Sequence, residues 1–157
     1  MINKKLFAML MACFLVVSLL LIFRPKDNSP VYRDSINQVS FSYPEQWKIS
    51  PSNNYIKLDS NPSNYLETNV LVTVNPNPFI IQSLGLDKQE LVKLGDKNIQ
   101  IIHKDNKVID SDKIITFTHV YWKADDNHKY WFQISPKQEG GFSDEVERFL
   151  ISFSPNE

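Results

Sequence analysis

The sequence predicts one α+β domain in which an antiparallel β-sheet is flanked by helices as an α/β/α sandwich, preceded by one N-terminal transmembrane helix. Three observations support this fold class. Apolar and polar residues alternate over residues 39–43, two apolar-rich runs at 113–123 and 129–135 flank a polar turn, and residues 142–153 carry apolar residues at helical spacing. Because one long apolar segment occupies the N-terminus, 157 residues leave room for one core and not for two.

Residues 1–23 form the predicted membrane anchor. Within them, residues 6–23 are 18 uncharged and mainly apolar residues, and a helix of that length reaches about 27 Å, close to the hydrocarbon thickness of a bilayer. A cleavable signal peptide has a shorter apolar core followed by small residues, whereas here Phe23 is followed at once by Arg24 and Pro25. We therefore expect an uncleaved signal anchor that spans the membrane.

Basic residues on both sides of the anchor bear on its orientation. Lys4 and Lys5 favour a cytoplasmic N-terminus, while Arg24 and Lys26 oppose them and reduce the bias. The expected arrangement keeps the N-terminus inside and the domain on the extracytoplasmic side, in a periplasm, at a cell surface or in a thylakoid lumen. Residues 24–30 are polar and bracketed by prolines, which predicts a short linker between membrane and domain.

Cys13 is the one cysteine of the chain, and two readings of it are open. Residues 10–13 resemble the bacterial lipobox that precedes a lipidated cysteine, although further apolar residues follow where a lipoprotein turns polar. The alternative is a thiol buried in the membrane. Both readings leave the domain tethered, and neither permits an intramolecular disulfide, so the fold depends on packing alone.

The domain itself is expected over residues 31–157. Two of the 17 lysines and arginines precede residue 24 and none of the 18 acids does, so the rest of the chain carries a net charge of −3. Basic and acidic residues alternate along it, and no basic patch stands out. Proteins that bind nucleic acid concentrate lysine and arginine on one face, so we expect no nucleic-acid partner.

The first half of the domain contains two clear strand signals. Val39, Phe41 and Tyr43 share one face of a strand that ends at Pro44, and the Trp47 ring is expected to fold back over the core. Residues 69–74 have the highest β-branched content, which predicts a central strand. Residues 52–64 are rich in Asn, Ser and Pro around one apolar pair and are expected to form a loop, a strand and a loop.

A short helix is expected after Asp87, because Asp87 and Glu90 have the spacing of a capping box and Gly95 can end the helix in a left-handed conformation. Its apolar residues would be Leu91 and Leu94. The segment before it, residues 76–86, is expected to be a long loop.

Three elements complete the predicted fold. Residues 99–102 form a strand, and residues 113–123 and 129–135 form a long hairpin around the turn Asp125-Asp126-Asn127-His128. The last helix begins at Ser143 as N-cap. One side of this helix must be buried against the sheet, since its apolar residues recur at helical spacing: Phe142, Val146, Phe149, Leu150 and Phe153.

These residues resemble the PsbP-like domain family in several places that follow one another in the expected order over residues 31–154. The matching motifs are Tyr32-x-Asp34, Phe41-Ser42-Tyr43-Pro44-x-x-Trp47, Asn69-Val70-x-Val72-x-Val74, Ser83-Leu84-Gly85 and Phe149-x-x-x-Phe153. The resemblance implies the fold of the extrinsic photosystem II PsbP proteins and of related bacterial lipoproteins. It also implies a non-catalytic binding or assembly module. The metal ligands of some PsbP proteins have no match in this sequence.

We expect no catalytic residues, no cofactor and no enzyme activity. His103, His119 and His128 are the only histidines, and none has an obvious catalytic partner. His119 is read as a strand residue that either faces solvent or is hydrogen-bonded in the core. His119 and His128 with Asp125 or Asp126 form a weak candidate metal site, and a polar loop is a weak candidate calcium site through Asp105, Asp110 and Asp112.

The candidate interaction residues are the hairpin aromatics Tyr121, Trp122, Tyr130 and Trp131. Strand alternation must place some of these rings on the solvent side, and exposed Trp and Tyr are frequent at interaction hot spots. An outward Trp131 would anchor a protein partner. The alternative is a second layer, from the C-terminal helix or residues 76–86, that covers the same face.

The leading functional expectation is therefore a non-catalytic, membrane-tethered extracytoplasmic module that binds a membrane protein complex as an accessory or assembly factor. That complex would be photosystem II if the host is photosynthetic. The alternatives are an envelope lipoprotein with a structural role and a domain that binds a small ligand or metal. A partner interface predicts an uncovered aromatic patch, and a ligand site predicts a closed pocket with converging polar groups.

Overall fold

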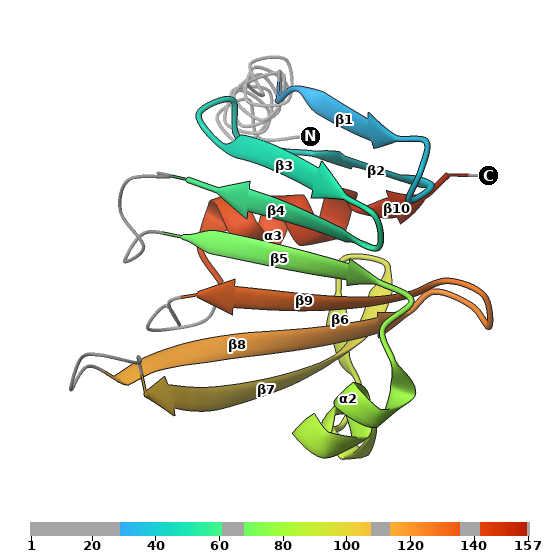
Figure 1. Ribbon diagram of the computed structural model, residues 1–157, viewed down its shortest axis with the longest axis vertical. Helices are drawn as coiled ribbons and strands as arrows, with labels where there is room; N and C mark the ends of the chain where they lie inside the picture. The colour runs from blue at the N-terminus through green and yellow to red at the C-terminus, as the bar shows by residue number, and fades with distance from the viewer. Residues whose placement is uncertain (1–28, 61–67, 108–113, 136–141, 157) are drawn as a thin grey trace, which may run out of the picture.

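A seven-stranded antiparallel sheet forms the centre of the domain (Figure 1). The computed structural model describes residues 29–60, 68–107, 114–135 and 142–156. In spatial order the strands are β3 (Lys48–Ser52), β4 (Tyr55–Asp59), β5 (Asn69–Val74), β9 (Lys129–Ser135), β8 (Ile114–Lys123), β7 (Lys97–Lys107) and β6 (Val92–Leu94). The predicted strand at 69–74 is confirmed and lies inside the sheet, between β4 and β9.

A second layer covers one face of this sheet. It consists of helix α3 (Asp144–Ser152) and a three-stranded sheet of β1 (Val31–Asp34), β2 (Val39–Ser42) and β10 (Ser154–Pro155). The sequence signals for residues 39–43, for the hairpin and for the final helix are all confirmed. The fold is thus a mainly antiparallel α+β structure with two α-helices among the described residues.

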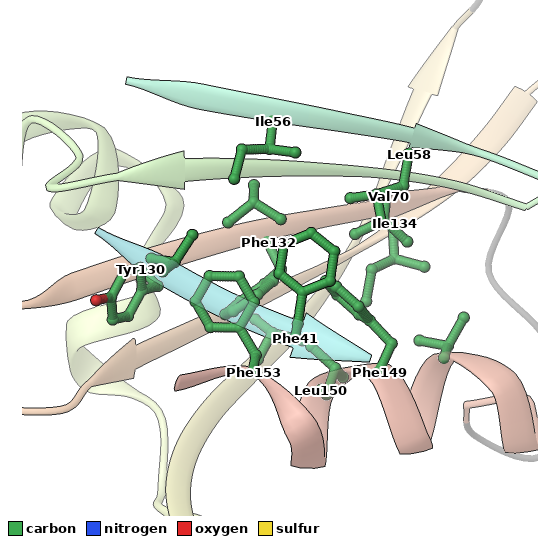
Figure 2. Close-up of a cluster of buried hydrophobic side chains, with 14 of the residues drawn as sticks. Phe41, Ile56, Leu58, Val70, Tyr130, Phe132, Ile134, Phe149, Leu150 and Phe153 are labelled. Carbon is green, nitrogen blue, oxygen red and sulfur yellow. The ribbon is translucent and has the colours of Figure 1, made fainter. Parts of the chain in front are cut away.

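The core lies between these two layers, and Phe153 is at its centre (Figure 2). This fully buried ring stacks on Phe41 of β2 with centroids 5.5 Å apart, and meets Phe132 and Tyr130 edge-on at 5.0 Å each. Burial of one such ring contributes roughly 1.5–3 kcal/mol. Trp47 is also buried and packs against Phe149, as its position after the Pro44 turn predicted.

Helix α3 starts where the sequence indicated. The hydroxyl of Ser143 accepts a hydrogen bond from the backbone N–H of Val146 at 3.3 Å, which satisfies one of the free donors of the first turn. Val146, Phe149 and Leu150 are buried against the sheet. At the C-terminal end of the helix, the ammonium of Lys97 donates a hydrogen bond to the carbonyl of Ile151 and lies 5.0 Å from the centroid of the Trp122 ring.

The helix predicted after Asp87 is wrong. The chain instead forms α2 at Pro78–Leu84 and a 3₁₀ helix, η1, at Leu86–Lys88, and Leu94 belongs to strand β6. Helix α2 occupies most of the predicted loop at 76–86. Asn77 caps it, because the side-chain oxygen of Asn77 accepts a hydrogen bond from the N–H of Phe79. The first residue of the helix is a proline, which loses no hydrogen bond at that position. Gly85, in the left-handed conformation, ends it.

The predicted anchor at residues 1–23, including Cys13, lies outside the described residues, as does the linker up to residue 28. Among the helices that the structure describes, none is both long and apolar enough to cross a membrane.

Candidate functional site

The seven-stranded sheet has a second face, opposite the core, which we call the open face. Cross-strand pairs share a face of a sheet, and every second residue of a strand points to the same side. The open face therefore carries Lys48, Ser50 and Ser52 of β3, Tyr55, Lys57 and Asp59 of β4, Asn69, Leu71 and Thr73 of β5, Lys129, Trp131 and Gln133 of β9, Phe117, His119, Tyr121 and Lys123 of β8, and Gln100, Ile102 and Lys104 of β7.

Helix α2 and η1 are the described elements that lie on this face, at its β7 end (Figure 1). The side-chain amide of Gln100 donates to the carbonyl of Gln89 just after η1 at 2.9 Å, and the ammonium of Lys104 lies 3.5 Å from the carbonyl of Ser83 in α2. Leu86 of η1 is fully buried. The two helical segments thus run beside β7, and in the described part of the chain nothing else lies over β4, β5 and β9.

His119 is the most buried side chain of the open face, with 3% of its surface exposed. Its ring lies beside those of Phe117 and Trp131, with centroid separations of 6.4 and 5.7 Å. The indole Nε1–H of Trp131 donates a hydrogen bond to Nδ1 of His119 at 3.3 Å. Because an indole nitrogen can only donate, Nδ1 must carry a lone pair, and a neutral His119 has its proton on Nε2.

The environment of His119 favours this neutral form. Burial lowers the pKa of the imidazole below its ordinary value, and the positive charges of Lys104 and His103 lower it further. Its Nε2 atom is buried and has no hydrogen-bond partner among the described groups. The imidazole is therefore held neutral, with one nitrogen bound to Trp131 and the other enclosed.

The four candidate interaction residues divide between the two faces. Trp131 and Tyr121 are cross-strand neighbours on the open face, and both are half-buried. Trp122 and Tyr130 are likewise neighbours, but they point into the core, where their rings stack at 5.3 Å. Tyr130 is 0% exposed, which removes it from the surface. The register of β8 and β9 fixed these pairs, and the position of α3 and β2 decided which pair became core.

The weak metal candidates are not assembled by the fold. His128 binds Asp125 within the hairpin turn, with Nδ1 and Oδ2 2.7 Å apart, whereas His119 lies in the middle of β8 opposite Gln133. Within the described ranges, no three His, Cys, Asp or Glu side chains gather closely enough to hold a metal ion. Asp105 accepts a hydrogen bond from Thr116, and residues 110 and 112 lie outside the described residues.

Sequence reasoning missed the distribution of lysines on the open face. Lys48, Lys57, Lys104, Lys123 and Lys129 come from five strands and share this side of the sheet, although they alternate with acids along the chain. Their spacing from the apolar residues could have revealed this. Each lysine lies one or three positions along its strand from a residue of the core face, and so points to the opposite face. Strand pairing therefore gathers on one side lysines that no basic run in the sequence reveals, and two of them, Lys57 and Lys123, are paired with Asp59 and Asp126.

Comparisons with known proteins add a likeness of fold. No protein-family model matches the sequence, and no curated protein matches it significantly. A crystal structure from Bacteroides thetaiotaomicron is similar, with a TM-score of 0.59 and 14% identity over 82% of this chain, which spans 49% of the length of the Bacteroides chain. LpqN, involved in cell envelope biogenesis of Mycobacterium tuberculosis, has a TM-score of 0.39 and 10% identity, over 70% of this chain and 72% of its own, a match too weak to carry an argument.

Proposed function

We propose that this chain is a non-catalytic, extracytoplasmic binding module, tethered by residues 1–23, that acts as an accessory or assembly factor of a membrane protein complex. In a photosynthetic host, photosystem II would be the complex. The observation that carries the proposal is the open face, on which Trp131, Tyr121 and Phe117 are half-buried and no described element lies over β4, β5 and β9. Aromatic rings on such a surface are the residues that most often dominate binding to a protein partner.

The state of His119 supports a binding role over catalysis. A general base needs a free nitrogen lone pair within reach of a substrate. In this protein the lone pair of Nδ1 accepts the Trp131 indole N–H, and Nε2 is buried. The imidazole therefore fixes the position of the Trp131 ring. It contributes a rigid element to the open face and no proton acceptor.

The family assignment is part of the same proposal. The motifs that resemble PsbP-like domains lie in β1, β2, β5, α2 and α3, and the antiparallel α+β architecture is compatible with that family. A membership of this kind would favour an accessory of a membrane complex over a structural envelope protein. The lipoprotein alternative differs in its anchor alone, through Cys13, and leaves the open face available.

The experiment is purification of the full-length protein from native membranes after mild crosslinking, followed by mass spectrometry of the retained proteins. Two variants accompany the wild type. Trp131→Ala removes the ring from the open face, and Ile36→Ala removes an exposed apolar side chain from the β1–β2 turn, away from that face.

We expect one membrane complex to be enriched with the wild type and with Ile36→Ala, and lost with Trp131→Ala. Retention of the same complex by all three proteins would show that binding does not use Trp131. Recovery of no complex with any of them would contradict the assembly role. Alkaline extraction of the same membranes tests the tether, because a spanning anchor keeps the protein in the pellet.

A further inference from the structure

Positive charge gathers on the open face. Among the described residues, Lys48, Lys57, Lys104, Lys123 and Lys129 point to this side. Two carboxylates pair with them: Asp59 of β4 with Lys57, and Asp126 of the hairpin turn with Lys123, whose Nζ lies 2.6 Å from Oδ1 of Asp126. In the first pair, Nζ of Lys57 and Oδ2 of Asp59 are 3.0 Å apart. Each pair is close to neutral, so the excess positive charge of this side comes from Lys48, Lys104 and Lys129. The chain as a whole is slightly acidic, which makes this concentration of lysines a property of the fold.

The opposite side of the molecule is acidic. Asp144, Glu145 and Glu147 lie in the first turn of α3, in the layer that covers the other face of the sheet. On the open face, η1 adds the exposed pair Asp87 and Lys88, which balance each other at the β7 end. The structure is therefore electrically asymmetric across the sheet, and such a field orients a charged partner during encounter.

The lysines surround an aromatic centre. Lys129 lies two residues from Trp131 on β9, Lys123 lies two residues from Tyr121 on β8, and both therefore share a face with those rings. Half-buried rings inside a ring of charges match the usual anatomy of a protein interface, with an apolar centre and a polar rim. Rings that protrude into a bilayer would be expected to stand free of their neighbours, whereas the Trp131 ring is fixed by its bond to His119.

From this distribution we propose that the open face docks an acidic surface segment of a partner protein, with Trp131 and Tyr121 against its apolar residues and the lysines against its carboxylates. The inference rests on the proposed function and deepens it, since it names the surface and the charge of the partner. The lysines steer the encounter and set its salt dependence, while the aromatic centre determines how long the complex lasts.

Site-specific photo-crosslinking in native membranes tests the inference. A benzoylphenylalanine replaces Thr73, the open-face neighbour of Trp131, in one full-length protein, and replaces Glu147 of α3 in another. The Thr73 probe is combined with Lys48→Gln and Lys129→Gln. The matched control is Arg33→Gln with Arg148→Gln, which removes the same charge from exposed positions away from the open face. Circular dichroism confirms that each variant is folded.

The expected result is a protein adduct from position 73 whose linked peptide carries net negative charge. Its yield should fall about tenfold in the lysine pair, or when the salt is raised to roughly 0.5 M, and should stay unchanged in the arginine pair. A neutral or basic linked peptide, an equal loss in both pairs, or an adduct with lipid or nucleic acid would overturn the inference. An adduct from position 147 alone would overturn it while leaving the proposed function intact, whereas no protein adduct from either probe would contradict both.

Discussion

The hydroxyl of Tyr130 gives the most direct test of the core. Tyr130 is completely buried, its ring packs on Phe153 and Trp122, and its oxygen has no hydrogen-bond partner among the described groups (Figure 2). Leaving a buried hydroxyl unbonded costs about 1–3 kcal/mol. Tyr130→Phe keeps the ring and removes that cost, so we expect the free energy of unfolding at pH 7 to rise by about 1 kcal/mol.

The loss of stability at alkaline pH gives a second, independent estimate of the effect of Tyr130. Burial, with a smaller effect from the Asp125 carboxylate, raises the pKa of Tyr130 from 10.0 to about 12. A group whose pKa is raised in the folded protein contributes stability that is complete below the unfolded pKa and is lost as the pH rises towards the folded pKa. At about 1.4 kcal/mol per pKa unit, wild type loses roughly 1.4 kcal/mol through Tyr130 between neutral pH and pH 11, and about twice that above pH 12.

The assay is urea unfolding of the full-length protein in detergent micelles, followed by circular dichroism at pH 7 and pH 11. Tyr130→Phe should exceed wild type by about 1 kcal/mol at pH 7 and by roughly 2–3 kcal/mol at pH 11, with the same denaturant slope. Tyr130→Ala is the opposing control, since losing the ring should cost about 3–5 kcal/mol. A Tyr130→Phe protein that is less stable than wild type at pH 7, or that loses stability in parallel with it at high pH, would refute the reasoning.

Three further predictions concern other buried polar groups. Lys97→Met should lower the free energy of unfolding by about 1–3 kcal/mol in urea, because it removes a charged hydrogen bond to the last turn of α3, while Lys93→Met on the exposed edge should change nothing measurable. Burial acts to raise the pKa of Asp34, but hydrogen bonds from Asn37, the Ile36 N–H and Tyr32 hold it below its ordinary value. The stability that Asp34 contributes should therefore be complete above about pH 4 and be lost as the pH falls below it, and Asp34→Asn should make the acid loss of stability smaller. His119 should show an Nε2-protonated neutral ring by nitrogen NMR and begin to titrate only below its ordinary pKa, with the Trp131 indole N–H signal shifting in the same pH range; titration at or above the ordinary pKa would contradict the described geometry.

Sequence patterns predicted correctly those elements that depend on one short segment of the chain. The stripe of Val146, Phe149 and Phe153 with the Ser143 cap was enough to place α3, and alternation was enough to place β5, β8 and β9. The helix after Asp87 failed because a capping-box spacing was outweighed by pairing. Val92 to Leu94 form an edge strand against β7, and Gly95 serves the turn between those strands. Residues 76–86 were expected to be a loop, although Asn77 and Pro78 within them form a strong helix start.

Part of the candidate site could be predicted from the sequence. Alternation showed that chain neighbours among the hairpin aromatics must lie on opposite sides of the sheet. The register then decided that Trp131 shares a side with Tyr121, and Tyr130 with Trp122. The sequence also offered two readings of His119, and each is right in part: the side chain lies on the open face and not in the core, but it is buried there and hydrogen-bonded to Trp131. The sequence contained no sign that Trp131 would be the donor, because that contact joins neighbouring strands and depends on their register.

The sequence by itself thus determined which residues share a face of each strand, because side chains alternate with a period of two whatever the surroundings. Only the tertiary structure decided which face receives α3 and β2, since that choice depends on contacts between segments far apart in the chain, such as Phe41 with Phe153. The same choice buried Tyr130 and left Trp131 on the open face. It also brought lysines from five strands to one side of the sheet, although in the sequence they lie scattered among acids.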